Sequence, residues 1–223
     1  RSLRPSIGGV VLKQRIGIMG GTFDPPHMAH LLIAENSRAA FSLDEVLFIP
    51  AADPPHKQDR AVTLYAHRYH MTELSIAAND AFTLSDIERK RSGLSYSLVT
   101  VRELQKLYRA GADFYFITGM DSINDLHKWY HPKELLASCY FIGATRLGDP
   151  VNTIALEKDF GKLACERIHF LEVPGMEISS TDIRRRVREG LPIRYLVPDA
   201  VKEYIRKEGL YLDKGDKRNA FSG

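Results

Sequence analysis

The chain has 223 residues, which is enough for one domain that buries most of its apolar surface. Hydrophobic residues make up 44% and charged residues 26%, a composition typical of globular proteins that excludes a fibrous or fully disordered chain. The net charge of +3 suits an anionic ligand without identifying one. No apolar run approaches the length of a membrane span, and Cys139 and Cys165 have no disulfide or metal spacing, so we expect a cytoplasmic protein with free thiols.

Strand and helix patterns alternate along most of the chain. Apolar or alternating runs predict strands at residues 15–19, 46–50, 82–87, 113–119, 139–144 and 168–173. Amphipathic runs predict helices at residues 28–41, 64–78, 95–110, 121–126, 132–137, 181–189 and 198–208. Residues 146–165 are interpreted as a loop followed by one helix.

This alternation predicts an α/β fold with a doubly wound parallel sheet and helices on both faces. In such sheets ligands bind beyond the carboxyl ends of the strands, where the strand order reverses. We expect one domain over residues 15–212, with a helical C-terminal part at about 181–210. Residues 1–14 are expected to be an extension outside the fold, and residues 213–223 a disordered polar tail.

The run Gly-Gly-Thr-Phe-Asp-Pro-Pro-His-Met-Ala-His at residues 20–30 joins the first strand to the first helix. Glycines let the backbone approach a ligand closely, and the N-terminal turn of a helix offers N–H groups that suit a phosphate. His27 and His30 are three positions apart and can project from one helix face. The alternatives are a tight turn, surface histidines or half of a metal site. No other His or Cys lies nearby at ligand spacing, so we expect no metal bound by protein side chains.

A second run, Ile-Ser-Ser-Thr-Asp-Ile-Arg, lies at residues 178–184. Ser180 or Thr181 is expected to be the N-cap of the next helix, whose first turn offers N–H groups and hydroxyls. Arg184 supplies a forked cation that matches phosphate oxygens. The alternative is a capped surface helix with a basic face. The arginine-rich residues 184–188 would also fit a nucleic-acid-binding protein, with strongly salt-dependent binding.

Both runs resemble signatures of the nucleotidyltransferase superfamily, GxFDPxHxGH and ISSTxIR. Within it, the longer form of the first run resembles most closely the bacterial nicotinate-nucleotide adenylyltransferase family. Three positions depart from the family pattern: Ala29 replaces a glycine, Ser97 replaces a threonine, and Leu147 stands where a proline usually follows the arginine, so Arg146 is left unassigned. Alanine is small and favours helices, so we expect the first change to be tolerated.

The resemblance implies a Rossmann-like fold with a small helical C-terminal part, and a role for each motif residue. The residues implied to be catalytic are His27, His30 and Arg184. Those implied to bind ATP are Gly20, Gly21, Thr22, Phe23, His30, Gly119, Asp121, Ser180, Thr181 and Arg184. Those implied to bind the second substrate are Lys57, Tyr96, Ser97 and Trp129. From the residues alone, Asp121 equally fits a helix cap, Trp129 a core position and Lys57 a surface position.

The implied reaction is adenylyl transfer from ATP to nicotinate mononucleotide, which yields deamido-NAD and pyrophosphate. The N–H groups at the start of the helix near Ser95–Ser97 suit a pyridine carboxylate, and Trp129 suits the ring. Mg²⁺ is expected to accompany ATP without a dedicated acidic cage. Nicotinamide mononucleotide and phosphopantetheine remain alternative acceptors. We expect no nucleic-acid or membrane partner, and a homo-oligomer is compatible with the sequence.

Overall fold

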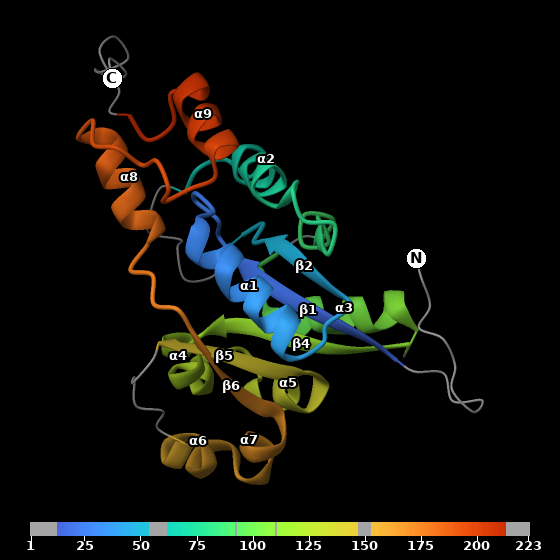
Figure 1. Cartoon of the computed structure of the whole chain (residues 1–223). Helices are drawn as coiled ribbons and strands as arrows, with labels where there is room; N and C mark the ends of the chain where they lie inside the picture. The colour runs from blue at the N-terminus through green and yellow to red at the C-terminus, as the bar shows by residue number, and fades with distance from the viewer. Residues whose placement is uncertain (1–12, 54–61, 92, 110, 147–152, 213–223) are drawn as a thin grey trace.

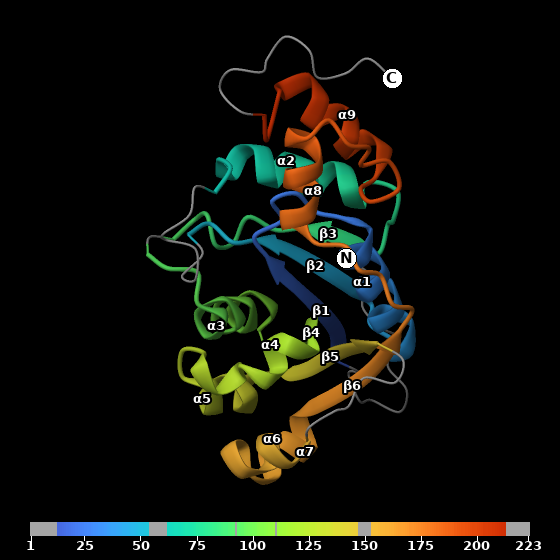
Figure 2. The same ribbon diagram turned by 90° about the vertical axis from the view of Figure 1, so that its left-hand side faces the viewer.

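The computed structural model describes residues 13–53, 62–91, 93–109, 111–146 and 153–212. Lys57, the extension before residue 13 and the tail after residue 212 lie outside the described residues. Within them, one sheet contains six strands in the order β3-β2-β1-β4-β5-β6, and every neighbouring pair is parallel (Figures 1 and 2). The strands are β1 Gln14–Gly21, β2 Glu45–Pro50, β3 Phe82–Leu84, β4 Ala112–Gly119, β5 Tyr140–Arg146 and β6 Ile168–Val173.

The helices cover both faces of this sheet. They are α1 Met28–Ala40, α2 Tyr65–Ile76, α3 Ser97–Tyr108, α4 Met120–Asn124, η1 Leu126–Lys128, α5 Pro132–Ser138, α6 Thr153–Phe160, α7 Lys162–Arg167, α8 Ser180–Arg188 and α9 Asp199–Glu208. Residues of α1 and α2 belong to one buried cluster, and residues of α3 to α7 to the cluster on the opposite face. Helices α8 and α9 pack on α2 beyond the β3 edge of the sheet (Figure 2). The doubly wound α/β fold is therefore confirmed.

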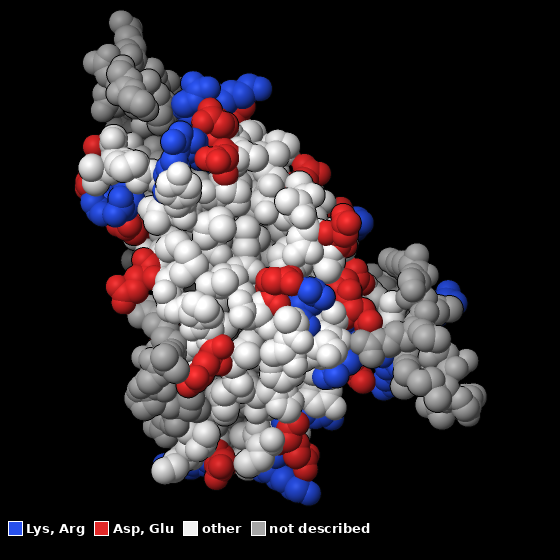
Figure 3. All heavy atoms as spheres, in the orientation of Figure 1, with Lys and Arg blue, Asp and Glu red and all other residues white. Residues whose placement is uncertain are grey.

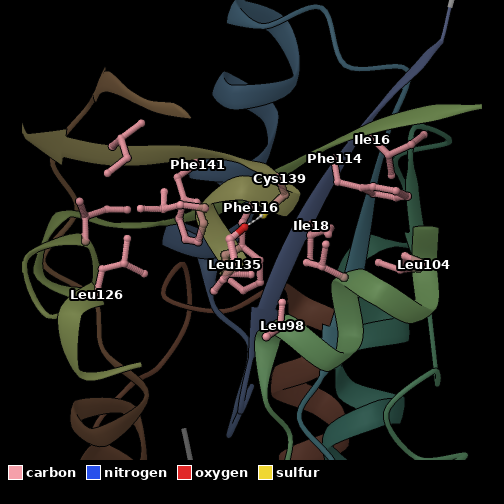
Figure 4. Packing of buried hydrophobic residues seen from close by; sticks show 14 of the residues in the cluster. Ile16, Ile18, Leu98, Leu104, Phe114, Phe116, Leu126, Leu135, Cys139 and Phe141 are labelled. Atoms are coloured by element: carbon pink, nitrogen blue, oxygen red, sulfur yellow. Dashed lines mark hydrogen bonds between the residues drawn. The ribbon is translucent and has the colours of Figure 1, made fainter. Parts of the chain in front are cut away.

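The alternation of side chains along the central strands explains how both faces of the sheet become buried. Side chains of a strand alternate between the two faces, so Ile16 and Ile18 of β1 point toward α3, while Met19 packs on the side of α1. Figure 4 shows Ile18 beside Phe116 and Leu98, three elements joined in one core. The strand order reverses between β1 and β4, which places the ligand-binding switch point at their carboxyl ends.

Several element boundaries differ from the sequence-based expectation, and three of them have a clear physical reason. Strand β1 begins at Gln14, one residue earlier, because the Gln14 N–H donates to the Gly111 carbonyl at 2.9 Å. Strand β3 ends at Leu84 rather than residue 87 because it pairs with β2 over only three positions at the edge of the sheet. Two helices replace the single one expected before residue 165, since Gly161 (φ 58°) separates α6 from α7.

The start of α3 also lies two residues later than expected, at Ser97. The Ser95 N–H donates to the Asp53 carbonyl at 3.0 Å, and the Asp53 N–H donates to the Ser95 hydroxyl at 3.1 Å. These bonds tie Ser95 to the segment that follows β2. The predicted carboxylate-binding turn is thereby fixed against the central part of the sheet.

Candidate active site

Two pockets open at the carboxyl ends of the strands, on either side of the switch point. We call the first the aromatic pocket; it has a volume of about 350 Å³, and its lining includes Gly20, Gly21, Thr22, Glu88, Tyr96, Ser97, Thr100, Lys128, Trp129 and Tyr130. We call the second the histidine pocket; it has a volume of about 400 Å³, and its lining includes His27, Ala29, His30, Gly119, Asp121, Thr145, Met176 and Ile178. The two ends of the first motif therefore line different pockets.

The loop from Thr22 to His27 links the two pockets, and Phe23 anchors it. Phe23 is only 2% exposed, and its ring meets His30 edge-on at 5.1 Å and Phe48 at 5.9 Å. Its φ of 50° lies in the left-handed region, which is unfavourable for a bulky side chain and is retained here by this packing. The Phe23 side chain thus supports the His30 ring from within the core, and does not line either pocket.

His27 and His30 form a stacked pair at the wall of the histidine pocket. Their ring centroids lie 3.7 Å apart, and the His27 backbone N–H donates to His30 Nδ1 at 3.1 Å. Because Nδ1 of His30 accepts this bond, the hydrogen-bond geometry assigns the proton of the neutral ring to Nε2. His30 is therefore arranged as a hydrogen-bond donor with a fixed ring plane.

His27 is the more buried member of the pair. It is 7% exposed, and its Nδ1 has no hydrogen-bond partner among the described residues. Burial lowers the pKa of His27 to about 4, because a charged imidazole would lose its hydration there. His27 is consequently uncharged near neutral pH.

The first turn of α1 offers fewer N–H groups than the sequence suggests. The Met28 N–H, expected to be available to a ligand, donates instead to the Leu196 carbonyl at 2.9 Å. The His27 N–H is taken by His30. Ala29, which replaces the family glycine, is 7% exposed and lines the histidine pocket, so its methyl group faces the ligand space.

The second motif packs directly against the first, although about 150 residues separate them. The Ser180 hydroxyl donates to the Pro25 carbonyl at 2.8 Å, and Arg184 Nη1 donates to the Asp24 carbonyl at 2.6 Å. Figure 1 shows the resulting arrangement, with α8 beside the start of α1. Exposed Thr181 accepts a bond from Arg184 Nη2 at 3.3 Å, so the motif forms one polar surface at the end of the 22–27 loop.

The N-cap of α8 differs from the one expected. The cap is Ser179, whose hydroxyl accepts from the Asp182 N–H at 3.1 Å, rather than Ser180 or Thr181. Three consecutive hydroxyl residues can each cap a helix, and the contact with Pro25 commits the Ser180 side chain elsewhere. This leaves the backbone N–H groups of Ser180 and Thr181 as the donors of the first turn.

Aromatic side chains form the outer wall of the aromatic pocket. Trp129 is half-buried and meets Phe116 edge-on at 5.7 Å, while Tyr96 stacks on Tyr130 at 4.4 Å. Tyr96 is the N-cap of α3 and makes no side-chain capping bond, so the N–H of Ser97 at the helix start faces no internal cap. The pocket thus combines a flat apolar wall with a helix N-terminus.

The sequence reasoning missed Glu88, which lines the same pocket. Glu88 is 7% exposed; its Oε1 accepts from the Thr100 hydroxyl at 2.7 Å, and its Oε2 is buried with no hydrogen-bond partner among the described residues. Arg91 Nη2 lies 3.7 Å from Oε1, but Arg91 Nη1 also pairs with Glu103 at 2.9 Å. No sequence pattern distinguishes this carboxylate from the surface charges around it.

The predicted residues therefore separate into three groups. Gly20, Gly21 and Thr22 line the aromatic pocket together with the predicted acceptor residues, whereas Gly119 and Asp121 line the histidine pocket. Ser180, Thr181 and Arg184 flank the loop between them. Among residues 13–53, 62–91, 93–109, 111–146 and 153–212, no three His, Cys, Asp or Glu side chains form a metal-binding group, and no helix is long and apolar enough to cross a membrane.

The comparisons with known proteins agree with one another. The model of the family described as cytidylyltransferase-like matches residues 18–186. A Moorella thermoacetica protein named probable nicotinate-nucleotide adenylyltransferase is 48% identical over 91% of this chain and 94% of its own length. A Desulfitobacterium hafniense protein of the same name is 46% identical, over 89% and 96%.

Solved structures extend the similarity to the fold. The structure of Plasmodium falciparum nicotinic acid mononucleotide adenylyltransferase complexed with NaAD superposes with a TM-score of 0.74 and 22% sequence identity. The alignment covers 89% of this chain and 97% of that one. At this identity the likeness shows a shared fold.

Proposed function

Since the chain belongs to the cytidylyltransferase-like family, and within it to the nicotinate-nucleotide adenylyltransferases, we propose that it transfers the adenylyl group of ATP to nicotinate mononucleotide. The products are deamido-NAD and pyrophosphate, in a step of NAD biosynthesis. The proposal treats residues 15–212 as one nucleotidyltransferase domain. The observation that carries it is the pair of pockets that meet at the 22–27 loop, one for each substrate.

We assign the mononucleotide to the aromatic pocket. The pyridine ring fits against Trp129, and its carboxylate suits the N–H group of Ser97 at the start of α3. Gly20, Gly21 and Thr22 line this pocket, which supports a position for the acceptor phosphate near the loop. Lys57 is proposed to contact the same substrate from outside the described residues.

We assign the adenosine end of ATP to the histidine pocket. Gly119 and exposed Asp121 lie at the start of α4 in this pocket, where the Asp121 carboxylate suits the ribose hydroxyls. The pyrophosphate end then points toward the start of α8, where the N–H groups of Ser180 and Thr181 and the guanidinium of Arg184 lie. Arg184 donates one N–H to the Asp24 carbonyl and one to the Thr181 hydroxyl, and we propose that its remaining N–H groups bind the phosphates.

The reaction needs no covalent intermediate on the protein. An oxygen of the acceptor phosphate attacks the α-phosphorus of ATP in line and forms the new P–O bond. The bond between the α-phosphorus and the oxygen leading to the β-phosphorus breaks, and pyrophosphate leaves with the electron pair. No proton has to be removed, because the attacking phosphate is already anionic. Catalysis therefore consists of positioning and of stabilising charge.

His30 stabilises the transferred group. Its Nε2–H is aimed by the Nδ1 bond and by the stacked His27 ring, and it donates to an oxygen of the α-phosphate. A donor already oriented before the reaction strengthens its interaction as charge develops. His27, held uncharged by burial, keeps the His30 plane fixed through ring stacking.

Nucleotidyltransferases of this family generally use a divalent metal with their nucleotide. We propose Mg²⁺, bound to ATP as part of the substrate. The described residues contain no group of three acidic or histidine ligands, so the phosphate oxygens supply most of its coordination.

One observation favours nicotinamide mononucleotide as a second acceptor. Glu88 lines the aromatic pocket, and its Oε2 is buried without a hydrogen-bond partner among the described residues, so its carboxylate acts on a pyridine substituent through its charge and not by direct contact. The charge of Glu88 disfavours a nicotinate carboxylate relative to a neutral amide, and Arg91 partly offsets this effect. The relative rates for the two pyridines therefore report on this pocket.

The nucleic-acid alternative is weakened by the pairing of the arginine run. Arg185 pairs with Asp182 at 2.6 Å and with Glu189, and Arg186 pairs with Asp182 at 2.8 Å. Figure 3 shows acidic and basic side chains interleaved over α8 and α9 on the visible face. A surface balanced in this way does not form the continuous basic stripe that a nucleic-acid backbone requires.

The test measures pyrophosphate release from ATP and Mg²⁺ with nicotinate mononucleotide, nicotinamide mononucleotide or phosphopantetheine as acceptor. We expect the highest kcat/KM with nicotinate mononucleotide and product formation that matches pyrophosphate release one to one. Turnover with phosphopantetheine alone, or with no acceptor, would overturn the proposal.

A further inference from the structure

The C-terminal part of the chain, residues 180–212, holds the first motif at four points. Three of them involve Ser180, Arg184 and the Leu196 carbonyl, described above. The fourth is a side-chain bond from the far end of the described chain: the Tyr211 hydroxyl donates to Asp24 Oδ1 at 2.8 Å. Tyr211 is 187 residues away from its partner, so local sequence gives no hint of this contact.

Asp24 lies inside a buried polar network. It is 4% exposed, and its Oδ2 accepts from the Thr63 N–H at 3.2 Å. Arg68, 2% exposed, provides the counter-charge; its Nε donates to the Thr63 carbonyl at 2.9 Å and its Nη1 to the Thr22 carbonyl at 2.7 Å. The network thus fixes both the start of the 22–27 loop, through Thr22, and its middle, through Asp24.

Tyr211 is suited to be a permanent donor in this network. Burial and the neighbouring Asp24 carboxylate raise the pKa of Tyr211, so the phenol keeps its proton over the working range of the protein. Its backbone adopts φ 67°, a conformation that non-glycine residues rarely take without compensation. The bond to Asp24 offers that compensation.

We propose that Tyr211 is a positioning residue for adenylyl transfer, which acts through Asp24 to fix the stacked pair of His27 and His30. The inference rests on the proposed function. Asp24 precedes His27 by three residues, and the loop between them carries the backbone atoms that aim the histidine rings. Without the Tyr211 hydroxyl, Asp24 Oδ1 stays buried without this donor, and the loop shifts to recover a partner.

The test compares Tyr211→Phe with Tyr195→Phe, a tyrosine of the same segment that is 80% exposed. Pyrophosphate release is measured well below the unfolding temperature of each variant. We expect Tyr211→Phe to lower kcat about 10-fold, since an error near 1 Å in placing reacting groups is costly. We expect its KM for nicotinate mononucleotide to stay within about twofold of wild type, because the Trp129 wall lies on the η1 side of the site. Tyr195→Phe should match the wild type.

A merely structural role gives a different result: a lower melting temperature with unchanged kcat of the folded enzyme, which overturns the proposal. Asp24→Asn is the second variant, and it changes the partner of the Tyr211 hydroxyl. If Tyr211→Phe does not fold, the proposal requires that Asp24→Asn show the same loss of kcat. In the double variant we expect less than the product of the single effects, because both changes act on one bond. Independent, multiplying effects overturn the proposal. A wild-type protein without turnover on any acceptor identifies failure of the proposed function itself.

Discussion

The two pockets differ in how their walls are built. The aromatic pocket has rings on one side and a buried acid on the other, so its lining is shaped around one kind of ligand. The histidine pocket is bordered by the 22–27 loop, the start of α4 and the segment that leads to α8, with few charges of its own. Under the proposed function, ligand choice resides in the first pocket, while the boundary between the pockets carries the transfer.

The boundary is also the part most strongly held by distant segments. The loop from Thr22 to His27 receives hydrogen bonds from α2, α8 and Tyr211, whereas the aromatic wall depends on α3 and η1. Changes at the boundary should lower kcat for every acceptor. Changes in the aromatic pocket should alter KM and the preference between acceptors.

The largest effect is expected for His30→Ala. It removes the donor aimed at the α-phosphate, and loss of one such donor lowers kcat by about 10²–10³-fold. The matched control is His70→Ala, an exposed histidine paired with Glu73 on α2. Steady-state kinetics with both pyridine nucleotides should show the same kcat loss for each; near-normal turnover by a folded His30→Ala protein contradicts its assignment.

The next prediction concerns the free energy of unfolding, which depends on pH through His27. Its pKa is 6.5 in the unfolded chain and about 4 in the folded protein, so the unfolded state binds more protons between these values. Stability is therefore lost as the pH falls from 6.5 toward 4, by about 3 kcal/mol from this residue.

Urea unfolding at pH 7, 6, 5 and 4.5 measures this loss. The His27→Asn protein should lose less free energy of unfolding over this range than the wild type, because its side chain at position 27 does not titrate. His70→Asn serves as the exposed control. Parallel curves for wild type and His27→Asn would show that burial does not depress the His27 pKa.

The parts of this boundary that follow from local chemistry could be predicted from sequence. A glycine turn between an apolar strand and an amphipathic helix predicts a phosphate site at a strand end, and the alternation of elements predicts the parallel sheet that brings such ends together. His27 and His30 do share one wall, but the predicted helix spacing is not the reason: His27 is the N-cap of α1 with extended backbone (φ −147°, ψ 170°), and its N–H bond to His30 Nδ1 and the ring stacking set the pair.

What the sequence could not predict depends on contacts between distant residues. Ser179, Ser180 and Thr181 can each cap a helix, and the bond of Ser180 to the Pro25 carbonyl removes one of these candidates only in the folded chain, where Ser179 is the cap. The Leu196 carbonyl occupies an N–H that helix geometry alone leaves available. Burial of Asp24 beside Tyr211 and Arg68 likewise exists only in the folded chain.

In the aromatic pocket, Trp129→Ala should weaken acceptor binding and spare ATP. Stacking of a ring on an aromatic side chain contributes about 1–3 kcal/mol, so KM for nicotinate mononucleotide should rise about 10-fold or more. Because Trp129 is half-buried against Phe116, its removal also lowers the stability of the fold. Trp129→Phe keeps an aromatic contact with Phe116 and is the control. An equal rise in KM for ATP would place Trp129 outside the acceptor site.

The smallest effect, and the one most specific to ligand choice, is expected for Glu88→Gln. The substitution keeps the shape and an acceptor for the Thr100 hydroxyl, but removes the negative charge beside the pyridine site. The repulsion between this carboxylate and that of nicotinate is then removed, while the neutral amide of nicotinamide is much less affected. The ratio of kcat/KM for nicotinate over nicotinamide mononucleotide should rise about 3- to 10-fold, with kcat nearly unchanged. Glu103→Gln, which removes the other carboxylate paired with Arg91 outside the pocket lining, is the matched control. An equal shift of the ratio in both variants would contradict this prediction. The acceptor preference would then reflect the combined charge around Arg91, and not Glu88 in particular.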